Sequence, residues 1–212
     1  GDVISQVHIT RTLQSAITRD RVGHAFVFSG PRGVGKTTVA RIFAKALNCV
    51  NGPAEEPCNE CDNCRSIQSG TSMDVQEQDG ASNNSVDDVR ELIANIGYHA
   101  SSCRYKIYII DEVHMLSTPA FNALLKTLEE PPGNVIFIFA TTEPHKIPVT
   151  VLSRCQRYDF HRLSVHDIAS KIRMIAEGDG LTVDDEAVML IAQRAGGAMR
   201  DAESVLEQLK SS

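Results

Sequence analysis

The sequence predicts an α/β fold: a parallel sheet with a phosphate-binding loop, flanked by helices and followed by a small all-helical domain. Three observations predict this fold. The segment from Gly30 to Thr37 reads G-x-x-x-x-G-K-[ST], the phosphate-binding (P-loop) motif. An apolar run at 25–28 precedes the motif and an amphipathic pattern follows it, which is the strand–loop–helix context that the motif requires. From residue 162 onward, apolar residues recur only with helical spacing.

Length and composition limit the class of protein. The 212 residues suffice for one sizeable domain and a small one, and the 42% hydrophobic and 23% charged content is typical of globular proteins. No apolar run approaches the roughly 20 residues of a membrane span, and the N-terminus carries no signal-peptide pattern. We therefore expect a cytoplasmic protein with no membrane partner. A net charge of −6 argues against a protein that coats nucleic acid non-specifically, but it does not exclude a local basic face.

The chain begins with a helix expected over residues 6–19, followed by the strand and the P-loop. In the helix after the loop, the apolar residues are spaced i, i+3, i+4, i+7 and i+8: Val39, Ile42, Phe43, Ala46 and Leu47.

The P-loop residues predict the binding of a nucleoside triphosphate. Gly33 and Gly35 allow the backbone to turn its N–H groups toward phosphate, and the helix dipole favours an anion. Lys36 is expected to reach the β- and γ-phosphates, where it supports catalysis, and Thr37 to hold Mg²⁺. The residues expected to contact ATP in this loop are Gly30, Pro31, Arg32, Gly33, Val34, Gly35, Lys36, Thr37 and Thr38.

Four cysteines occupy an insert at residues 49–64 that is rich in Pro, Asn and Glu and has no core periodicity. They are Cys49, Cys58, Cys61 and Cys64. This spacing can place four thiolates around one tetrahedral Zn²⁺. Disulfides and redox catalysis are the alternatives, but disulfides suit a cytosolic chain poorly and the context is not thioredoxin-like. A closed four-thiolate site leaves no position for a substrate, so we expect a structural role.

The segment 106–112 carries the second nucleotide-site motif. A buried-type strand, 106–110, ends in Asp111 and Glu112, a Walker B element. We expect this strand to neighbour the P-loop strand, so that Asp111 orients Mg²⁺ and Glu112 polarises the attacking water. Between the insert and this strand, 73–79 is a weak strand candidate. Capping residues at 82–85 then open a helix.

The segment after Walker B contains a helix, two strands and a candidate arginine. Thr118 is expected to cap a helix that Pro131 and Pro132 stop. An apolar strand over 135–139 runs on to Thr142, a polar residue that can contact the γ-phosphate or simply terminate a strand. Arg154 precedes a short strand at 158–160, and such a lone arginine is usually a surface residue.

In the remainder of the chain, apolar residues recur with the spacing of amphipathic helices. The composition changes near residue 162, and we therefore expect an ATPase domain over 1–161 and a helical domain over 162–212.

At this point the chain resembles the gamma/tau family of AAA+ ATPases, the clamp loaders of bacterial DNA polymerase III. A P-loop alone is shared by very many proteins, but the cysteine insert together with Ser-Arg-Cys is far more specific. The stretches that carry the resemblance are 24–37, the four-cysteine insert, 79–84, 111–117, 121–132, 140–142, 153–155 and 197–202.

The resemblance implies roles that the spacing does not show. Thr142 matches the family's sensor 1, and Arg200, on the helical lid, matches sensor 2. Arg154 matches the arginine finger, which reaches the ATP of a neighbouring subunit and stabilises charge on the transferring phosphoryl group. The family opens a ring-shaped sliding clamp when ATP is bound and closes it on primed DNA after hydrolysis.

The resemblance also implies partners. These are the delta and delta-prime subunits, further gamma/tau copies, the sliding clamp and primer-template DNA. The helices that start at Ser85 and Thr118 are candidates for holding DNA phosphates through backbone N–H groups, although ordinary capping explains both ends equally well.

The chain departs from the family pattern in two ways. It has Ile4-Ser5-Gln6 where the family usually shows Val-Gly-Gln near the adenine, and we expect these 212 residues not to include the family's collar domain. Both departures bear on adenine recognition and assembly.

Two other functions compete with an ATP-hydrolysing motor. The sequence Asp-Glu-Val-His also occurs in superfamily 2 helicases, but the residues after Phe160 are too few for a second RecA-like domain. A non-hydrolysing structural subunit such as delta-prime is the alternative within the family. The intact set of Lys36, Thr37, Asp111 and Glu112 argues against it.

Overall fold

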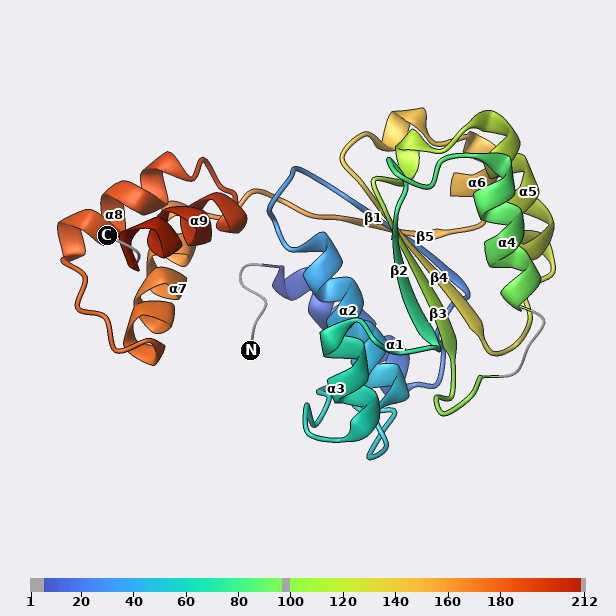
Figure 1. The fold of residues 1–212 in the computed structure, drawn as a ribbon, viewed down its shortest axis with the longest axis horizontal. Coiled ribbons are helices and arrows are strands. Elements are labelled where there is room, and N and C mark those ends of the chain that lie inside the picture. The colour runs from blue at the N-terminus through green and yellow to red at the C-terminus, as the bar shows by residue number, and fades with distance from the viewer. Residues whose placement is uncertain (1–5, 97–99, 211–212) are drawn as a thin grey trace. The chain divides into compact units, whose positions relative to one another are not determined.

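The computed structural model describes residues 6–96 and 100–210 (Figure 1). The strands are β1 (Ala25–Ser29), β2 (Val75–Asp79), β3 (Lys106–Asp111), β4 (Val135–Thr141) and β5 (Gln156–Asp159). The helices before β4 are α1 (Val7–Thr18), α2 (Lys36–Asn48), α3 (Asp62–Ser69), α4 (Val86–Ile96), η1 (Val113–Met115) and α5 (Thr118–Glu129). Those after it are η2 (Pro144–Lys146), α6 (Val149–Leu152), α7 (Val165–Gly178), α8 (Asp185–Arg194) and α9 (Met199–Lys210).

The described residues form two compact units. The sheet unit comprises residues 8–29 and 37–159. The second unit comprises residues 6–7, the P-loop residues 30–36, and the C-terminal segment 160–210.

All five strands are parallel, in the order β2-β3-β4-β1-β5. This arrangement confirms the predicted α/β class with a parallel sheet. The expectation that the Walker B strand neighbours the P-loop strand is wrong, because β4 lies between β3 and β1. The sequence does not reveal that β4 lies between β1 and β3. It follows β3 along the chain, and its apolar side chains are those of any buried strand. The carboxyl ends of β3 and β4 nevertheless meet at one edge of the sheet, as parallel strands require.

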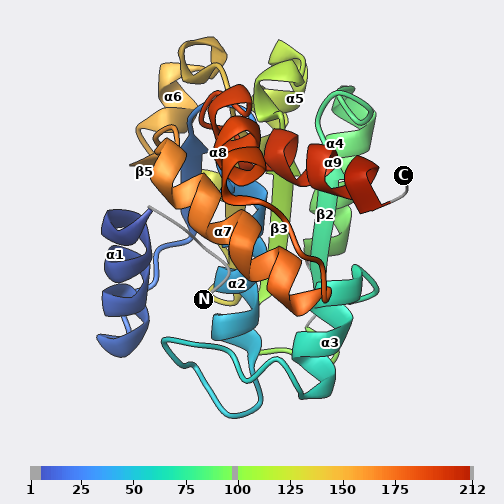
Figure 2. The same cartoon turned by 90° about the vertical axis from the view of Figure 1, so that its left-hand side faces the viewer.

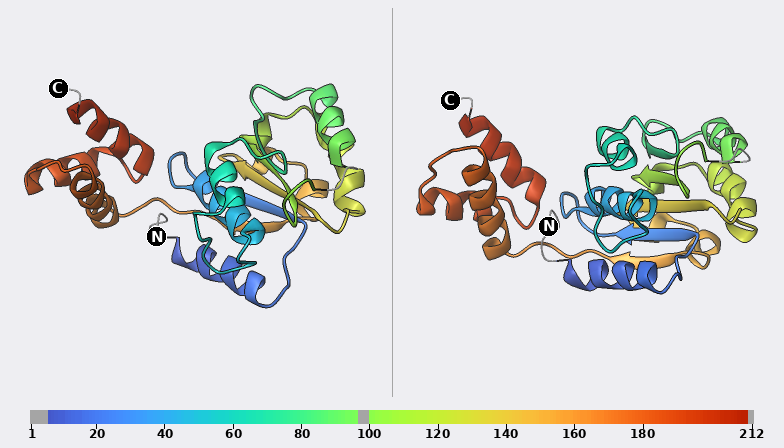
Figure 3. Two further views of the ribbon diagram at one scale, coloured as in Figure 1. Left: turned by 60° about the horizontal axis from the view of Figure 1, so that its bottom comes forward. Right: turned by 90° about the horizontal axis from the view of Figure 1, so that it is seen from below.

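Helices cover both faces of the sheet, which is why its strands read as continuous apolar runs. On one face, α4 and α5 pack with β1, β3 and β4 in one core cluster that includes Val27, Leu92, Leu124, Phe137 and Phe139 (Figure 1). On the other face, the Phe26 and Phe43 rings meet edge-to-face at 5.2 Å and join β1 to α2. The helix α1 lies beside β5, where His8 Nε2 is 3.2 Å from the Asp159 carbonyl oxygen (Figure 3).

The second unit has a core of its own. Helices α7, α8 and α9 enclose a cluster that includes Ile168, Ile172, Ala192 and Leu206 (Figure 2). Ser164 caps α7 by accepting the Asp167 N–H at 3.1 Å. This confirms the predicted helical character of the segment after residue 161. Within residues 6–96 and 100–210, no helix is both long enough and apolar enough to cross a membrane.

Three local expectations need correction. The cap of α5 is Ser117 rather than Thr118, because the Ser117 hydroxyl accepts the Ala120 N–H at 3.3 Å. The last strand is 156–159 rather than 158–160. The cysteine insert ends in a helix, α3, which sequence periodicity missed because its apolar face consists of only Cys64 and Ile67.

The departure at Ile4-Ser5-Gln6 is described only in part, since residues 4 and 5 lie outside the described residues. The Gln6 side chain is buried. Its Nε2 donates to the His161 carbonyl at 2.7 Å, and its Oε1 accepts the His161 N–H at 3.3 Å.

Asp74 anchors the loop before β3. Its buried carboxylate accepts the N–H groups of Ser101, Ser102 and Cys103 at 2.8, 2.8 and 2.9 Å. Burial opposes ionisation of Asp74, but these hydrogen bonds outweigh it and lower its pKa.

We expect Asp74→Asn to lower the free energy of unfolding at pH 7 by roughly 1–3 kcal/mol, because the amide cannot accept all three bonds. Since the folded pKa is lowered, this stabilisation is present above the unfolded pKa of about 3.9 and is lost as pH falls through the folded pKa. Urea unfolding at pH 7 and pH 3 tests this, with the exposed Asp87→Asn as control. Equal stability of Asp74→Asn and the unsubstituted protein at pH 7 would contradict the anchoring role.

Candidate functional site

The P-loop holds its lysine with its own backbone. Lys36 is buried, and its Nζ donates to the carbonyl oxygens of Gly30 at 2.8 Å and Pro31 at 2.7 Å. Lys36 is also the first residue of α2, so its ammonium group is tethered at a helix N-terminus. The loop therefore presents a fixed positive charge and a helix end, the features that favour a phosphate group.

Gly33 joins the P-loop to the start of α9. Its carbonyl oxygen accepts the Met199 N–H at 2.8 Å, and its φ is +72°. A Cβ at Gly33 would lie 2.9 Å from the Ala198 Cβ and 3.4 Å from the Arg200 Cβ, so only glycine fits there. Arg200, the predicted sensor 2 residue, directly follows Met199, whose N–H donates to the P-loop.

The Walker B strand meets the hydroxyl of Thr37 in the sheet unit. Thr37 Oγ1 donates to Asp111 Oδ2 at 2.7 Å, and the other carboxylate oxygen of Asp111 accepts the Glu112 N–H at 2.8 Å. Two oxygen ligands of the kind that Mg²⁺ prefers, a hydroxyl and a carboxylate, are thus in direct contact. The two residues predicted to hold Mg²⁺ lie together.

Glu112 and Thr142 also lie together. Glu112 follows β3 with a left-handed backbone (φ +46°), which is uncommon for a residue other than glycine. Thr142 follows β4, and its Oγ1 donates to Glu112 Oε2 at 3.3 Å. The predicted water-polarising carboxylate and the predicted sensor 1 hydroxyl are therefore hydrogen-bonded partners at adjacent strand ends.

Our sequence reasoning assigned no role to His114, which lies in this site. The side chain is 6% exposed, and Nδ1 is 2.9 Å from Thr141 Oγ1 and 3.5 Å from Glu112 Oε2. On the other side of the ring, Nε2 is 3.3 Å from Glu143 Oε2. The available signal was its place in Asp-Glu-Val-His, three residues after Asp111.

Arg154 lies just after α6 in the sheet unit. One guanidinium nitrogen donates to Glu129 Oε1 at 2.6 Å and the other to the Thr150 carbonyl at 2.5 Å. The side chain of Arg154 is 32% exposed and that of Glu129 is 51% exposed. An ion pair this open to water is weak, so the guanidinium can exchange this partner for another anion at little cost.

The four cysteines of the insert form a compact cluster. The sulfur atoms of Cys49, Cys58, Cys61 and Cys64 all lie within 4.8 Å of one another, and none is in a disulfide. The Cys58 and Cys64 sulfurs are 4.0 Å apart, close to the roughly 3.8 Å that a tetrahedron with Zn–S bonds of about 2.3 Å requires. This donor set is compatible with zinc.

Hydrogen bonds and burial shift the pKa values of these thiols. Hydrogen bonding from the backbone at Val50 lowers the pKa of Cys61 to about 6, whereas burial raises the pKa of Cys64 to about 12. Cys61 also caps α3, since its sulfur accepts the Cys64 N–H at 3.4 Å. A thiolate at a helix N-terminus is electrostatically favoured, so the missed helix α3 is part of the cysteine site.

Lys45 fastens the insert to α2. Its buried Nζ donates to Asn59 Oδ1 and Gln68 Oε1, both at 2.8 Å. The cysteine insert is therefore docked on α2 rather than extending from it.

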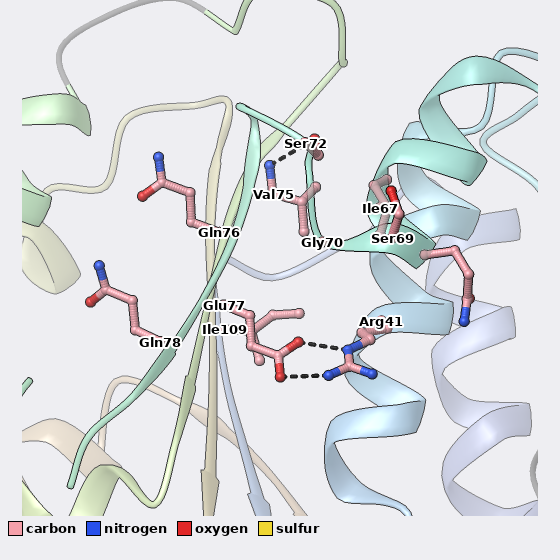
Figure 4. A pocket seen from close by; sticks show the side chains of 11 residues that line it. Arg41, Ile67, Ser69, Gly70, Ser72, Val75, Gln76, Glu77, Gln78 and Ile109 are labelled. Carbon is pink, nitrogen blue, oxygen red and sulfur yellow. Dashed lines mark hydrogen bonds and ion pairs between the residues drawn. The ribbon is translucent and has the colours of Figure 1, made fainter. Parts of the chain in front are cut away.

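A pocket of about 610 Å³ lies beside the edge strand β2 (Figure 4). Arg41 and Glu77 point toward each other there and form an ion pair with distances of 2.6 and 2.7 Å, whereas Gln76 and Gln78 point to the other side of the strand. The two charges of the pocket neutralise each other. Of the residues that line it, Ile109 belongs to the Walker B strand β3, and none belongs to the P-loop.

Comparison with protein families gives two matches that together span most of the chain. A model described as "DNA polymerase III, delta subunit" matches residues 5–164. A second, described as "DNA polymerase III clamp loader subunit, ATPase lid domain", matches residues 167–209.

Curated relatives are similar along nearly the whole chain. DNA polymerase III subunit tau of Bacillus subtilis (strain 168) is 54% identical over 207 residues, which are 98% of this chain and 37% of the relative. DNA polymerase III subunit tau of Escherichia coli (strain K12) is 46% identical over 208 residues, 98% of this chain and 32% of the relative. The chain thus spans about a third of the length of these relatives.

A solved structure is similar in fold. The RuvB Holliday junction branch migration motor of Thermotoga maritima superposes with a TM-score of 0.71 over 98% of this chain and 62% of that chain. The sequences are 20% identical, so the likeness concerns the fold alone.

Proposed function

The chain belongs to the DNA polymerase III clamp-loader family, and on that premise we propose that it is the ATP-hydrolysing core of a gamma/tau-type subunit. It uses ATP and Mg²⁺ to open a sliding clamp and load it onto primed DNA. The observation that carries this proposal is the contact between Thr37 and Asp111, which supports a shared Mg²⁺ site for these two side chains. The alternative, a non-hydrolysing structural subunit, is not favoured, because the similar relatives are named tau.

We assign the roles of the site residues from their chemistry. The loop from Gly30 to Thr38 binds the phosphates, and Lys36 exchanges its loop carbonyls for phosphate oxygens. Thr37 and Asp111 hold Mg²⁺, which when bound neutralises charge on the phosphate oxygens. Glu112 accepts a proton from the attacking water.

The remaining roles concern sensing and the neighbouring subunit. Thr142 holds Glu112 and reads the γ-phosphate as sensor 1, and Arg200 acts as sensor 2 from the start of α9. Arg154 leaves Glu129 to reach the ATP of the adjacent subunit. The first family match ends at residue 164 and the second begins at residue 167. This supports a boundary between an ATPase domain, 1–161, and a lid, 162–212.

The partners follow from the family. We propose assembly with the delta and delta-prime subunits and with further gamma/tau copies, and binding to the sliding clamp. Backbone N–H groups at the starts of α4 and α5 are the proposed contacts to primer-template DNA. The proposed location is the cytoplasm.

The binding of ATP tests this proposal. We expect Lys36→Ala to weaken ATP binding by at least about 100-fold, because a charged contact to the phosphates is lost. Titration of the protein with a fluorescent ATP analogue measures the dissociation constant. The exposed Lys126→Ala is the control, and its affinity should equal that of the unsubstituted protein. Unchanged affinity in Lys36→Ala would remove the phosphate assignment.

We also propose that Cys49, Cys58, Cys61 and Cys64 bind one structural Zn²⁺, which the compact sulfur cluster supports. Elemental analysis is expected to give one zinc per chain. Cys64→Ser should reduce the zinc content and lower the thermal midpoint, whereas Cys155→Ser, outside the cluster, should keep the zinc. Free thiols in a protein without zinc would refute the assignment.

A further inference from the structure

We propose that His114 is a positioning residue for Glu112, and that it ties this carboxylate to the segment that follows β4. The inference rests on the proposed function, in which Glu112 polarises the attacking water. The His114 ring lies between two carboxylates from different segments, with Glu112 on its Nδ1 side and Glu143 on its Nε2 side.

The backbone conformation of Glu112 explains why its carboxylate has to be oriented by side chains of other residues. Glu112 is the residue between β3 and η1, and its left-handed conformation ends the strand abruptly. No hydrogen bond from the Glu112 side chain caps η1. Its Oε2 lies 3.3 Å from the Thr142 hydroxyl and 3.5 Å from His114 Nδ1. The direction of this carboxylate therefore depends on groups from the end of β4 and from η1.

The Nδ1 side of His114 is held firmly. Nδ1 is 2.9 Å from the hydroxyl of Thr141, a residue with no exposed surface, and that hydroxyl accepts the Glu143 N–H at 3.0 Å. The ring cannot shift toward or away from Glu112 without breaking the contact with Thr141. Because the Thr141 hydroxyl and the His114 ring are both buried, the contact between them fixes the ring beside the carboxylate.

The Nε2 side joins the ring to η2. Glu143 Oε2 is 3.3 Å from Nε2 and 2.9 Å from Lys146 Nζ. Hydrogen bonding from Lys146 lowers the pKa of Glu143. Electrostatic interaction with His114 and His145 lowers it further by a smaller amount. The network thus runs from Thr142 and Glu112 through His114 to Glu143 and Lys146. It links the proposed catalytic carboxylate to the chain that continues into α6 and Arg154.

A nearby histidine provides a matched control. His145 also approaches Glu143, with 3.8 Å between its Nε2 and Oε1, but its side chain is 73% exposed. His145→Ala therefore removes an imidazole from the same segment and leaves the support of Glu112 intact.

The experiment measures ATP affinity and turnover in His114→Ala, His114→Asn, His114→Gln and His145→Ala. We expect His114→Ala to lower kcat about tenfold or more while the dissociation constant for ATP changes less than about twofold, because a misplaced carboxylate affects the chemical step. An asparagine amide takes the place of Nδ1 and a glutamine amide that of Nε2. His114→Asn should therefore recover most of the turnover, His114→Gln less, and His145→Ala should match the unsubstituted protein.

Three outcomes overturn the proposal: full turnover in His114→Ala, an equal fall in ATP affinity and kcat, or equal full activity of His114→Asn and His114→Gln. If His114→Ala fails to fold, the comparison of the asparagine and glutamine variants decides. An unsubstituted protein that binds no ATP would instead refute the proposed function, so the two failures are distinguishable.

Discussion

Arg154→Ala is expected to lower ATP turnover by the assembled protein about 10³- to 10⁵-fold, the effect that arginine fingers have where they have been measured. Arg154 forms an ion pair with Glu129, and that ion pair is open to water. Its guanidinium is therefore available to stabilise charge on a phosphoryl group of the neighbouring subunit. Steady-state phosphate release by the assembled subunits measures the effect.

Two further variants sharpen this test. Arg154→Lys keeps the charge but loses the planar fork, so we expect it to recover only a small part of the turnover. Arg157→Ala removes an exposed arginine from β5, which pairs with Asp159, and should leave turnover unchanged. Normal turnover in Arg154→Ala would mean that the site is complete within one chain.

Glu112→Gln is expected to reduce turnover about 10²- to 10⁴-fold and to leave ATP binding intact, because an amide cannot accept a proton from water. The glutamine keeps the size of the side chain and can still accept the hydrogen bond from Thr142. The ATP-bound form of this variant should therefore accumulate. Single-turnover hydrolysis, together with an ATP-binding titration, separates the two steps.

Glu186→Gln is the control for this substitution, because Glu186 is an exposed residue of the first turn of α8. It should bind and hydrolyse ATP as the unsubstituted protein does. If Glu112→Gln hydrolyses ATP at the normal rate, another group acts as the base.

The α/β class and most of the individual strands and helices could be predicted from the sequence, because local patterns determine them. The strands β1, β3 and β4 are continuous apolar runs, and β4 is buried along its whole length. The Walker motifs predicted a shared Mg²⁺ role for Thr37 and Asp111, and the structure places their side-chain oxygens 2.7 Å apart. The sensor 1 role of Thr142 was predicted through the family resemblance, since a threonine at a strand end more often simply terminates the strand.

Other features depend on contacts that the sequence does not show. The place of β4 between β3 and β1 is a matter of tertiary topology. The helix α3 has too small an apolar face for a periodic signal, and its cap is a cysteine, Cys61, rather than one of the usual capping residues. The role we propose for His114 depends on Thr141 and Glu143, which lie 27 and 29 residues further along the chain and reach it only through the adjacent strand end.

The central claim is that ATP hydrolysis by this chain is completed in an assembly. The most direct test is ATP turnover by the protein alone and after assembly with delta, delta-prime, clamp and primed DNA. The account predicts slow turnover alone and a large rise on assembly, because the neighbouring subunit supplies Arg154. Full activity of the protein alone, with no rise on assembly, would contradict it and identify a self-contained ATPase.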